Sequence, residues 1–180
     1  MLMKTFDDGY VVREVSLEEY RSYTKPHYER VFSNRVQNYV PVELDDNSRG
    51  KIIERSREKR FELRLLMFKN DDLVGWHYGC EQSAEVYYMQ NSAVLENHRN
   101  QKLYSRLLDV VLDCVHAEGF QVVVGTHHPH NAAVLIPKIK RGFFISGMQF
   151  NENFGSLVEL KYIFNTDRRG RYYKNLGLEL

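Results

Sequence analysis

The chain has 180 residues, of which 43% are hydrophobic and 13% aromatic, so it is long enough for one well-packed core and short for two. Its 25 basic and 24 acidic residues leave a formal charge of +1, which gives no general electrostatic case for binding nucleic acid. No stretch approaches the roughly 18 apolar residues of a membrane span, and the N-terminus lacks a signal-peptide core. We expect one cytoplasmic domain that binds neither nucleic acid nor membrane.

The first half of the chain predicts two helices followed by three strands. A β-type run at residues 10–15 precedes Ser16 and Glu19, which match a capping box and so begin a helix over residues 16–32. A charged second helix with a narrow apolar stripe is expected at residues 48–60. Apolar runs separated by short polar breaks then predict an antiparallel meander. Its strands span residues 61–68, 73–80 and 84–94.

The second half predicts a helical crossover and a return to the sheet. A long helix ends at Gly119, and the buried strand that follows, at residues 120–126, should pair in parallel with the preceding strand. A helix at residues 131–140 and strands at 143–150 and 157–164 complete an α/β fold with a mixed (α+β) sheet. We assign residues 1–165 to the domain and residues 166–180 to a basic, aromatic tail. The tail docks either on this domain or on a second copy, which leaves a homodimer open.

The segment from Val94 to Leu108 joins the end of a strand, a tight loop and the first turns of the long helix. A helix N-terminus exposes unpaired N–H groups and the positive end of the helix dipole. Arg99, Lys102 and Arg106 add positive charge at this point. The sequence therefore predicts an anion site, with phosphate as the natural occupant.

Two segments and the element order resemble the GNAT superfamily of N-acetyltransferases over about residues 10–164. Ala93 and Val94, followed by Arg99, resemble the end of that fold's fourth strand and the first residue of its R/Q-x-x-G-x-G/A pyrophosphate loop. Residues 131–143, from Asn131 to Phe143, are similar to the superfamily's N-x-x-A-x-x-L-Y-x-K-x-G-F segment. The resemblance implies a single-domain GNAT-like fold with a parallel pair between its fourth and fifth strands.

The resemblance also implies a binding site for acetyl-CoA or another acyl-CoA. The residues that it assigns to this site are Ala93, Val94, Leu95, Arg99, Asn100, Gln101, Lys102, Leu103, Tyr104, Ser105 and Asn131. Lys102 and Tyr104 stand where the loop pattern has small residues, which narrows the approach of a phosphate to the backbone. The amides can still donate if these residues have ordinary helical dihedrals and point their side chains away. Lys102 could then compensate through its charge.

The second segment has Lys138 where relatives often place a tyrosine as general acid toward the departing thiolate. A lysine can serve in that role only if burial or a neighbouring cation lowers its pKa. A solvated, charged Lys138 is the interpretation that we favour at this point. Pro137 predicts a kink or early unwinding of the helix, and Asn131 is expected to cap its first turn while it contacts the cofactor.

No residue is an obvious general base, so several candidates remain. Tyr88 and Gln90 share one face of the fourth strand, although core packing explains Tyr88 equally well. His127 and His128 lie at the end of the fifth strand, where successive side chains diverge and at most one faces the site. With His130 they lack a fourth ligand at recognisable spacing, so we expect no metal.

Two functions remain open from the sequence. The first is an N-acetyltransferase that moves an acetyl group from acetyl-CoA to a primary amine of a small molecule or peptide by direct attack. Its catalytic candidates are Tyr88, Gln90, His127, His128 and Lys138. The alternative is a non-catalytic module of the same fold that senses an acyl-CoA or mediates an interaction, as the departures at Lys102, Tyr104 and Lys138 would suit.

Overall fold

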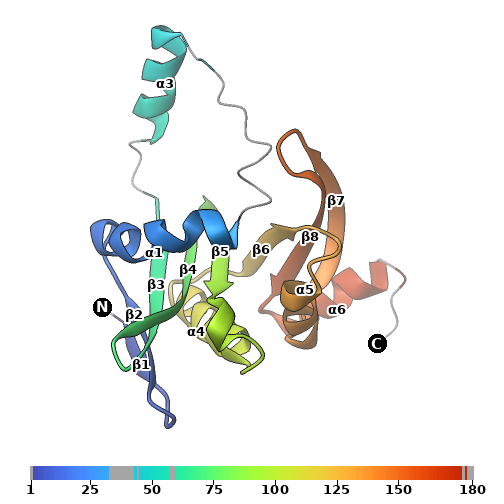
Figure 1. Ribbon diagram of the computed structural model, residues 1–180. Helices are drawn as coiled ribbons and strands as arrows, with labels where there is room; N and C mark the ends of the chain where they lie inside the picture. Colours follow the sequence, from blue (N-terminus) through green and yellow to red (C-terminus); the bar gives the residue numbers. More distant parts are fainter. Residues whose placement is uncertain (1, 33–42, 44, 57–59, 176, 178–180) are drawn as a thin grey trace.

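The computed structural model describes residues 2–32, 43, 45–56, 60–175 and 177 (Figure 1). One sheet of eight strands forms its centre. The strands are β1 (Met3–Thr5), β2 (Tyr10–Glu14), β3 (Glu62–Lys69), β4 (Asp72–Ser83), β5 (Val86–Val94), β6 (Val122–His127), β7 (Phe144–Asn151) and β8 (Gly155–Ile163). The helices are α1 (Leu17–Val31), α3 (Asp46–Ser56), α4 (Leu103–Ala117), α5 (Ala132–Lys140) and α6 (Thr166–Asn175), with a 3₁₀ turn at Glu96–His98.

The sheet is mixed, as predicted. Its strand order is β1-β2-β3-β4-β5-β6-β8-β7, and among the described strands β5 and β6 form the parallel pair while the other neighbours are antiparallel. The α4 crossover between β5 and β6 accounts for this, because parallel neighbours need a connection that returns to the same end of the sheet. The α/β fold with a mixed sheet is confirmed.

Helices cover both faces of the sheet (Figure 1). α4 packs Leu107, Leu108 and Val111 into the main core on one face, and Leu135 brings α5 against the same core. On the opposite face, α1 covers the N-terminal half of the sheet through Tyr20. α6 covers the C-terminal half of that face with two tyrosines, which contact a cluster of buried residues that includes Phe144. These packing groups fix the strands that carry the candidate site.

β5 and β6 separate before they end. Their pairing covers Val86 to Tyr88 on β5, although β5 continues to Val94 and β6 to His127. Gln90 is the extra residue of a bulge in β5, since Tyr78 pairs with Asn91 while Gly79 pairs with Met89. A bulge bends a strand and increases its twist. We call the two diverging strand ends, residues 89–94 and 125–127, the fork.

Several local predictions meet the structure. Ser16 caps α1, since its side chain accepts a hydrogen bond from the Glu19 amide at 3.1 Å. The early unwinding predicted at Pro137 is wrong, because α5 continues to Lys140. The predicted helix at residues 48–60 corresponds to α3, although residues 57–59 lie outside the described part of the chain. No helix among the described residues is long and apolar enough to cross a membrane.

Candidate active site

The loop between β5 and α4 bends through left-handed backbone conformations. Asn100 has φ +63° and Lys102, the residue before α4, has φ +59° and ψ +14°. The condition that Lys102 keeps ordinary helical dihedrals is therefore wrong. Asparagine tolerates this region better than most side chains, whereas for lysine it carries strain of about 1–2 kcal/mol. Lys102 adopts the conformation that a glycine would take at little cost, at the position where the resembled loop has a glycine.

The start of α4 leaves backbone donors unpaired. Within the described residues, the amides of residues 100–105 donate to no protein acceptor. The first turn of α4 contains no acidic residue, and Lys102 makes no side-chain cap. Unpaired amides at the positive end of a helix dipole suit an anion. The backbone of this loop therefore fits a pyrophosphate group.

The basic side chains near the loop are engaged to different degrees. Arg99 is exposed and bonds through Nε to the Val94 carbonyl at 3.3 Å. We expected Arg106 to add positive charge to the anion site. Its guanidinium is instead ion-paired with Asp8 in the turn between β1 and β2, at 2.6 Å. Gln101 accepts a hydrogen bond from the Tyr10 hydroxyl at 3.0 Å. Arg99 and Lys102 remain as the exposed cations beside the free amides.

The other residues assigned to the cofactor site hold the loop in place. Ala93, Leu95 and Leu103 are buried, and the Leu95 amide donates to the Val74 carbonyl at 2.8 Å. Val94 and Tyr104 are half-buried against the main core, and Ser105 is half-buried as well. Burial raises the pKa of Tyr104. Cofactor contacts by these residues stay predictions, whereas their anchoring of the loop is visible.

Lys138 is fully buried, so the solvated lysine that we favoured is wrong. Its side chain is 0% exposed, and Nζ lies 2.9 Å from Nε2 of His127 on β6. Nζ also lies 5.0 Å from the centre of the Phe143 ring, within reach of a cation–π contact. A Cβ on Gly125 would stand 3.0 Å from Nζ, so the missing side chain on β6 provides the space for the amine. Burial lowers the pKa of Lys138 from 10.5 to about 7.

The two candidate histidines diverge at the end of β6. His127 meets Lys138, while His128 stacks on His130 with ring centres 5.3 Å apart and planes inclined by 26°. Both histidines are half-buried. The structure thus brings Lys138 and His127 together at the fork and turns His128 to another partner.

The remaining candidates surround the fork without joining that pair. The Tyr88 hydroxyl lies 2.8 Å from Oγ1 of Thr126 and ties β5 to β6 where their backbone pairing stops. Gln90 is exposed at the bulge. Asn131 precedes α5 but makes no side-chain cap, so that prediction is wrong; its carbonyl accepts from the Val134 and Leu135 amides instead. Its backbone (φ −79°, ψ +64°) is not the extended form usual at an N-cap.

Several solved structures that resemble this one are acetyltransferases. The ribosomal-protein-S5-alanine acetyltransferase of Vibrio fischeri matches with a TM-score of 0.65 at 10% identity, over 92% of this chain and 98% of its own. This chain has the GNAT fold. A GNAT family acetyltransferase of Elizabethkingia anophelis with acetyl-CoA bound matches at 0.59 with 16% identity, over 88% of this chain and 100% of its own.

The spermidine N-acetyltransferase of Vibrio cholerae, solved with CoA and spermine, matches at 0.61 with 12% identity, over 87% of this chain and 96% of its own. No protein-family model matches the sequence, and neither does any curated protein. Identities of 10–16% with TM-scores near 0.6 mean that the GNAT fold is shared while most side chains differ. The chemistry has to be argued from this chain's own residues.

A second polar network of this GNAT fold was missed by the sequence analysis. Nδ1 of His77 on β4 lies 2.7 Å from Oγ of Ser92, and Nε2 lies 2.7 Å from the hydroxyl of Tyr87. His77 and Tyr87 are 0% exposed, while Ser92 is half-buried. The signal in the sequence was a histidine inside the otherwise apolar run of residues 73–80. Its partners depend on strand register, which local patterns do not reveal.

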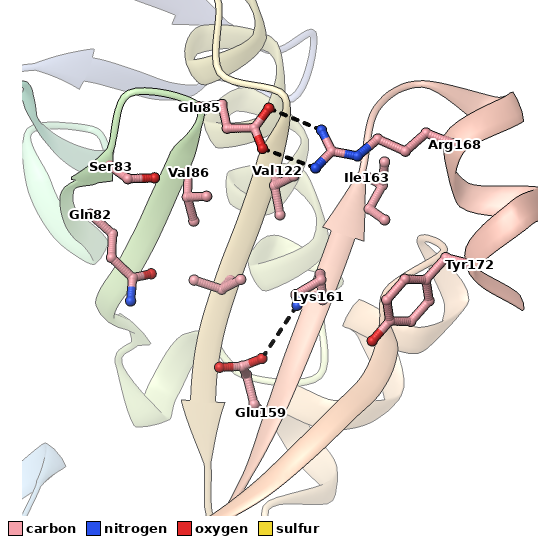
Figure 2. Close-up of a pocket in the computed structure, with 11 residues that line it drawn as sticks. Gln82, Ser83, Glu85, Val86, Val122, Glu159, Lys161, Ile163, Arg168 and Tyr172 are labelled. Atoms are coloured by element: carbon pink, nitrogen blue, oxygen red, sulfur yellow. Dashed lines mark hydrogen bonds and ion pairs between the residues drawn. The ribbon is translucent and has the colours of Figure 1, made fainter. Parts of the chain in front are cut away.

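A cavity of about 420 Å³ lies under α6, on the face of the sheet opposite α4 and α5 (Figure 2). Its floor is formed by apolar residues of β5, β6 and β8, including Val86, Val122 and Ile163. The charged groups at its rim are paired with one another. Arg168 binds both oxygens of Glu85 at 2.9 and 3.0 Å, and Lys161 lies 3.8 Å from Glu159. The cavity runs along β6 from Val122 to Val124 and reaches Glu159, which pairs with Thr126 of the fork.

Proposed function

We propose that this chain is an N-acetyltransferase that moves the acetyl group of acetyl-CoA, or another acyl-CoA, to a primary amine of a small molecule or peptide. The observation that carries the proposal is Lys138, a fully buried amine at the fork with His127 2.9 Å away. A buried, ionisable side chain with a neutral-range pKa is typical of functional sites. The GNAT fold supports the acyl-CoA class of substrate.

In this proposal the loop before α4 binds the pyrophosphate of the acyl-CoA. The unpaired amides of residues 100–105 donate to phosphate oxygens, and Arg99 and Lys102 add charge at the surface. The pantetheine arm then extends from this loop and brings the thioester to the fork, where β5 and β6 no longer pair. The β5 edge of the fork, residues 89–94, does not pair with β6, so its backbone groups can bond the linear part of the cofactor as an added strand would.

The reaction is a direct attack of the amine on the thioester. The amine nitrogen bonds to the carbonyl carbon, the carbon–sulfur bond breaks, and the sulfur leaves as a thiolate. Lys138 in its ammonium form donates a proton to that thiolate, so the leaving group departs as a thiol. A pKa of about 7 makes Lys138 a much stronger acid than an ordinary lysine, and it can be reprotonated near neutral pH.

The amine must also lose a proton to a base. Among the candidates from the sequence, His127 contacts Lys138 directly and lies on the strand that borders the fork. A histidine that accepts the amine's proton could return it to neutral Lys138 for the next turnover. Tyr88, Gln90 and His128 stay alternative candidates for this role, with Tyr88 placed where β5 and β6 separate.

Two measurements on the wild-type protein test the proposal. Calorimetric titration with acetyl-CoA should give saturable binding, and a set of primary amines, from polyamines to peptides with a free N-terminus, should release CoA thiol at a rate above hydrolysis. If the titration gave no heat of binding and millimolar acetyl-CoA did not raise the melting temperature, any role in acyl-CoA binding would be contradicted. Saturable binding without thiol release for any amine class would instead support the non-catalytic module.

A further inference from the structure

The network of Ser92, His77 and Tyr87 has the outline of a nucleophile, its base and a third group that orients the base. Both ring nitrogens of His77 are engaged, each at 2.7 Å. His77 and Tyr87 have no exposed surface, so neither exchanges these bonds for water. Ser92 is half-buried and forms the outer end of the network. The positions of its protons decide what Ser92 can do.

The buried hydroxyl of Tyr87 fixes these protons. Within the described residues, Nε2 of His77 is the hydrogen-bond partner of that hydroxyl. Burial raises the pKa of Tyr87 well above its ordinary value, so the hydroxyl keeps its proton. A buried donor without an acceptor is costly, and therefore the Tyr87 O–H donates to Nε2. Burial, together with the positive charge of Lys138, lowers the pKa of His77 to about 3, so the ring is neutral.

A neutral imidazole that accepts at Nε2 carries its proton on Nδ1. The Nδ1–H of His77 then donates to the Ser92 oxygen, and His77 cannot remove the Ser92 proton. This arrangement excludes a nucleophilic serine activated by His77. It also leaves the Ser92 hydrogen without an acceptor among the described residues, so the hydroxyl is a donor turned away from the network.

The position of Ser92 indicates what it meets. It lies on the part of β5 that no longer pairs with β6. Successive side chains of a strand point to opposite faces, and the bulge at Gln90 shifts this alternation by one residue. Ser92 after the bulge therefore lies on the same face of the sheet as Tyr87 and Met89 before it. This is also the face of Lys138, since Nζ of Lys138 and the Cβ of Met89 are both close neighbours of Gly125. A ligand held in the fork on this side of the sheet therefore meets the face that carries both Lys138 and Ser92.

We propose that the Ser92 hydroxyl donates a hydrogen bond to the carbonyl oxygen of the acyl group, with His77 and Tyr87 as the positioning residues that orient it. The inference rests on the proposed acyltransferase function. When the amine attacks, the carbonyl oxygen gains negative charge, and a donor already aimed at it stabilises that charge without reorganisation. Ser92 and Lys138 then divide the work: Ser92 stabilises the oxygen, and Lys138 protonates the sulfur.

Kinetics of Ser92→Ala, with Ser92→Thr as the matched control that keeps the hydroxyl, test the catalytic part. We expect Ser92→Ala to lower kcat about 10- to 100-fold with acetyl-CoA affinity within about twofold, and Ser92→Thr to recover most of the rate. Tyr87→Phe should lower kcat less, because it frees His77 to change tautomer while Ser92 keeps its hydroxyl. A Ser92→Ala variant as active as wild type overturns the inference and leaves the proposed function intact.

Nitrogen-15 NMR of histidine-labelled protein tests the proton positions without any turnover. Long-range proton–nitrogen correlations, assigned with His77→Gln, should show the Nδ1–H tautomer of His77 from pH 6 to 8. An Nε2–H tautomer, or an acyl-serine detected by mass spectrometry after incubation with acetyl-CoA, overturns the inference. Wild-type protein without transferase activity overturns the proposed function and, with it, the role of Ser92.

Discussion

The fork and the loop before α4 differ in how far their polar groups are buried and hydrogen-bonded. At the fork, Lys138, His77 and Tyr87 are fully buried and hydrogen-bonded to neighbouring side chains. In the loop before α4, Lys102 is exposed and the amides of residues 100–105 find no acceptor in the described part of the chain. Desolvation shifts the pKa of the buried groups. The loop instead offers unpaired donors, and water and salt screen the charges beside them. Substitutions in the fork should change rate and pH dependence, and those in the loop should change affinity.

The largest effect should come from Lys138→Met, which keeps an unbranched side chain of nearly the same length and removes the amine. In the proposed reaction Lys138 protonates the departing thiolate, so we expect the variant to lower kcat about a hundredfold while acetyl-CoA affinity is kept. Steady-state rates and calorimetry measure the two quantities. Lys140→Met is the control, because Lys140 lies in the same helix and is exposed. Equal rates for both variants would remove Lys138 from the chemistry.

The burial of Lys138 also predicts how stability depends on pH. Its pKa is about 7 in the folded protein, against 10.5 for an ordinary lysine. Between these values the unfolded chain binds a proton that the folded chain does not, so stability rises with pH, by at most about 1.4 kcal/mol per pH unit. Urea unfolding from pH 7 to 9 should therefore show wild type gaining on Lys138→Met. A constant difference would mean that Lys138 stays charged in the fold.

The same titration shapes the rate. A general acid works in its protonated form, so the proposed role of Lys138 predicts that kcat of the wild-type protein declines above about pH 7. Lys138→Tyr restores the residue type that the resembled segment has at this position, and a tyrosine keeps its proton to a higher pH. The decline should move upward in that variant. If the pH profile does not shift, the group that titrates is another one.

A smaller effect is expected in the loop, where Lys102 has φ +59°. Lys102→Gly relieves the strain of a side chain in the left-handed region but makes the unfolded chain more flexible, for a net gain of about 0.5 kcal/mol in the free energy of unfolding. Lys102→Ala keeps a Cβ and should gain nothing. Both variants lose the same charge, so tighter acetyl-CoA binding by the glycine variant would measure closer backbone approach. Equal affinities would show that the Cβ does not obstruct the phosphate.

Much of the fold was predictable because its signals are local. Alternating or continuous apolar runs located β2 to β8, and the helical crossover indicated the parallel pair. β1 has three exposed residues and no pattern of its own, and it forms because β2 offers a free edge. α6 contains no buried residue and was read as a tail. It is held by Tyr172 and Tyr173, which lie against Phe144 at ring distances of 4.8 and 5.1 Å.

The position of the candidate site along the chain was predictable, whereas the conformation and burial of its side chains were not. Strand end, basic residues and helix start located the loop, whereas the left-handed conformation of Lys102 depends on how the tertiary fold closes that loop. Lysine is usually exposed, and the burial of Lys138 depends on the space beside Gly125 on another element. The contact of His77 with Ser92 requires the β4–β5 register and the bulge at Gln90. Spacing along one strand does not encode these long-range facts.

The smallest effect should come from the ion pair between Arg168 and Glu85 at the cavity under α6 (Figure 2). Both side chains are largely exposed, at 42% and 51%, so water replaces most of what the pair provides. Arg168→Met should leave the urea midpoint unchanged, while Tyr172→Ala on the same helix should lower it, because Tyr172 packs against Phe144. If Arg168→Met lowered the urea midpoint as much as Tyr172→Ala, the exposure of a polar contact would not tell us how much it contributes to stability. The different behaviour that we expect of the buried groups at the fork would then need an explanation other than desolvation.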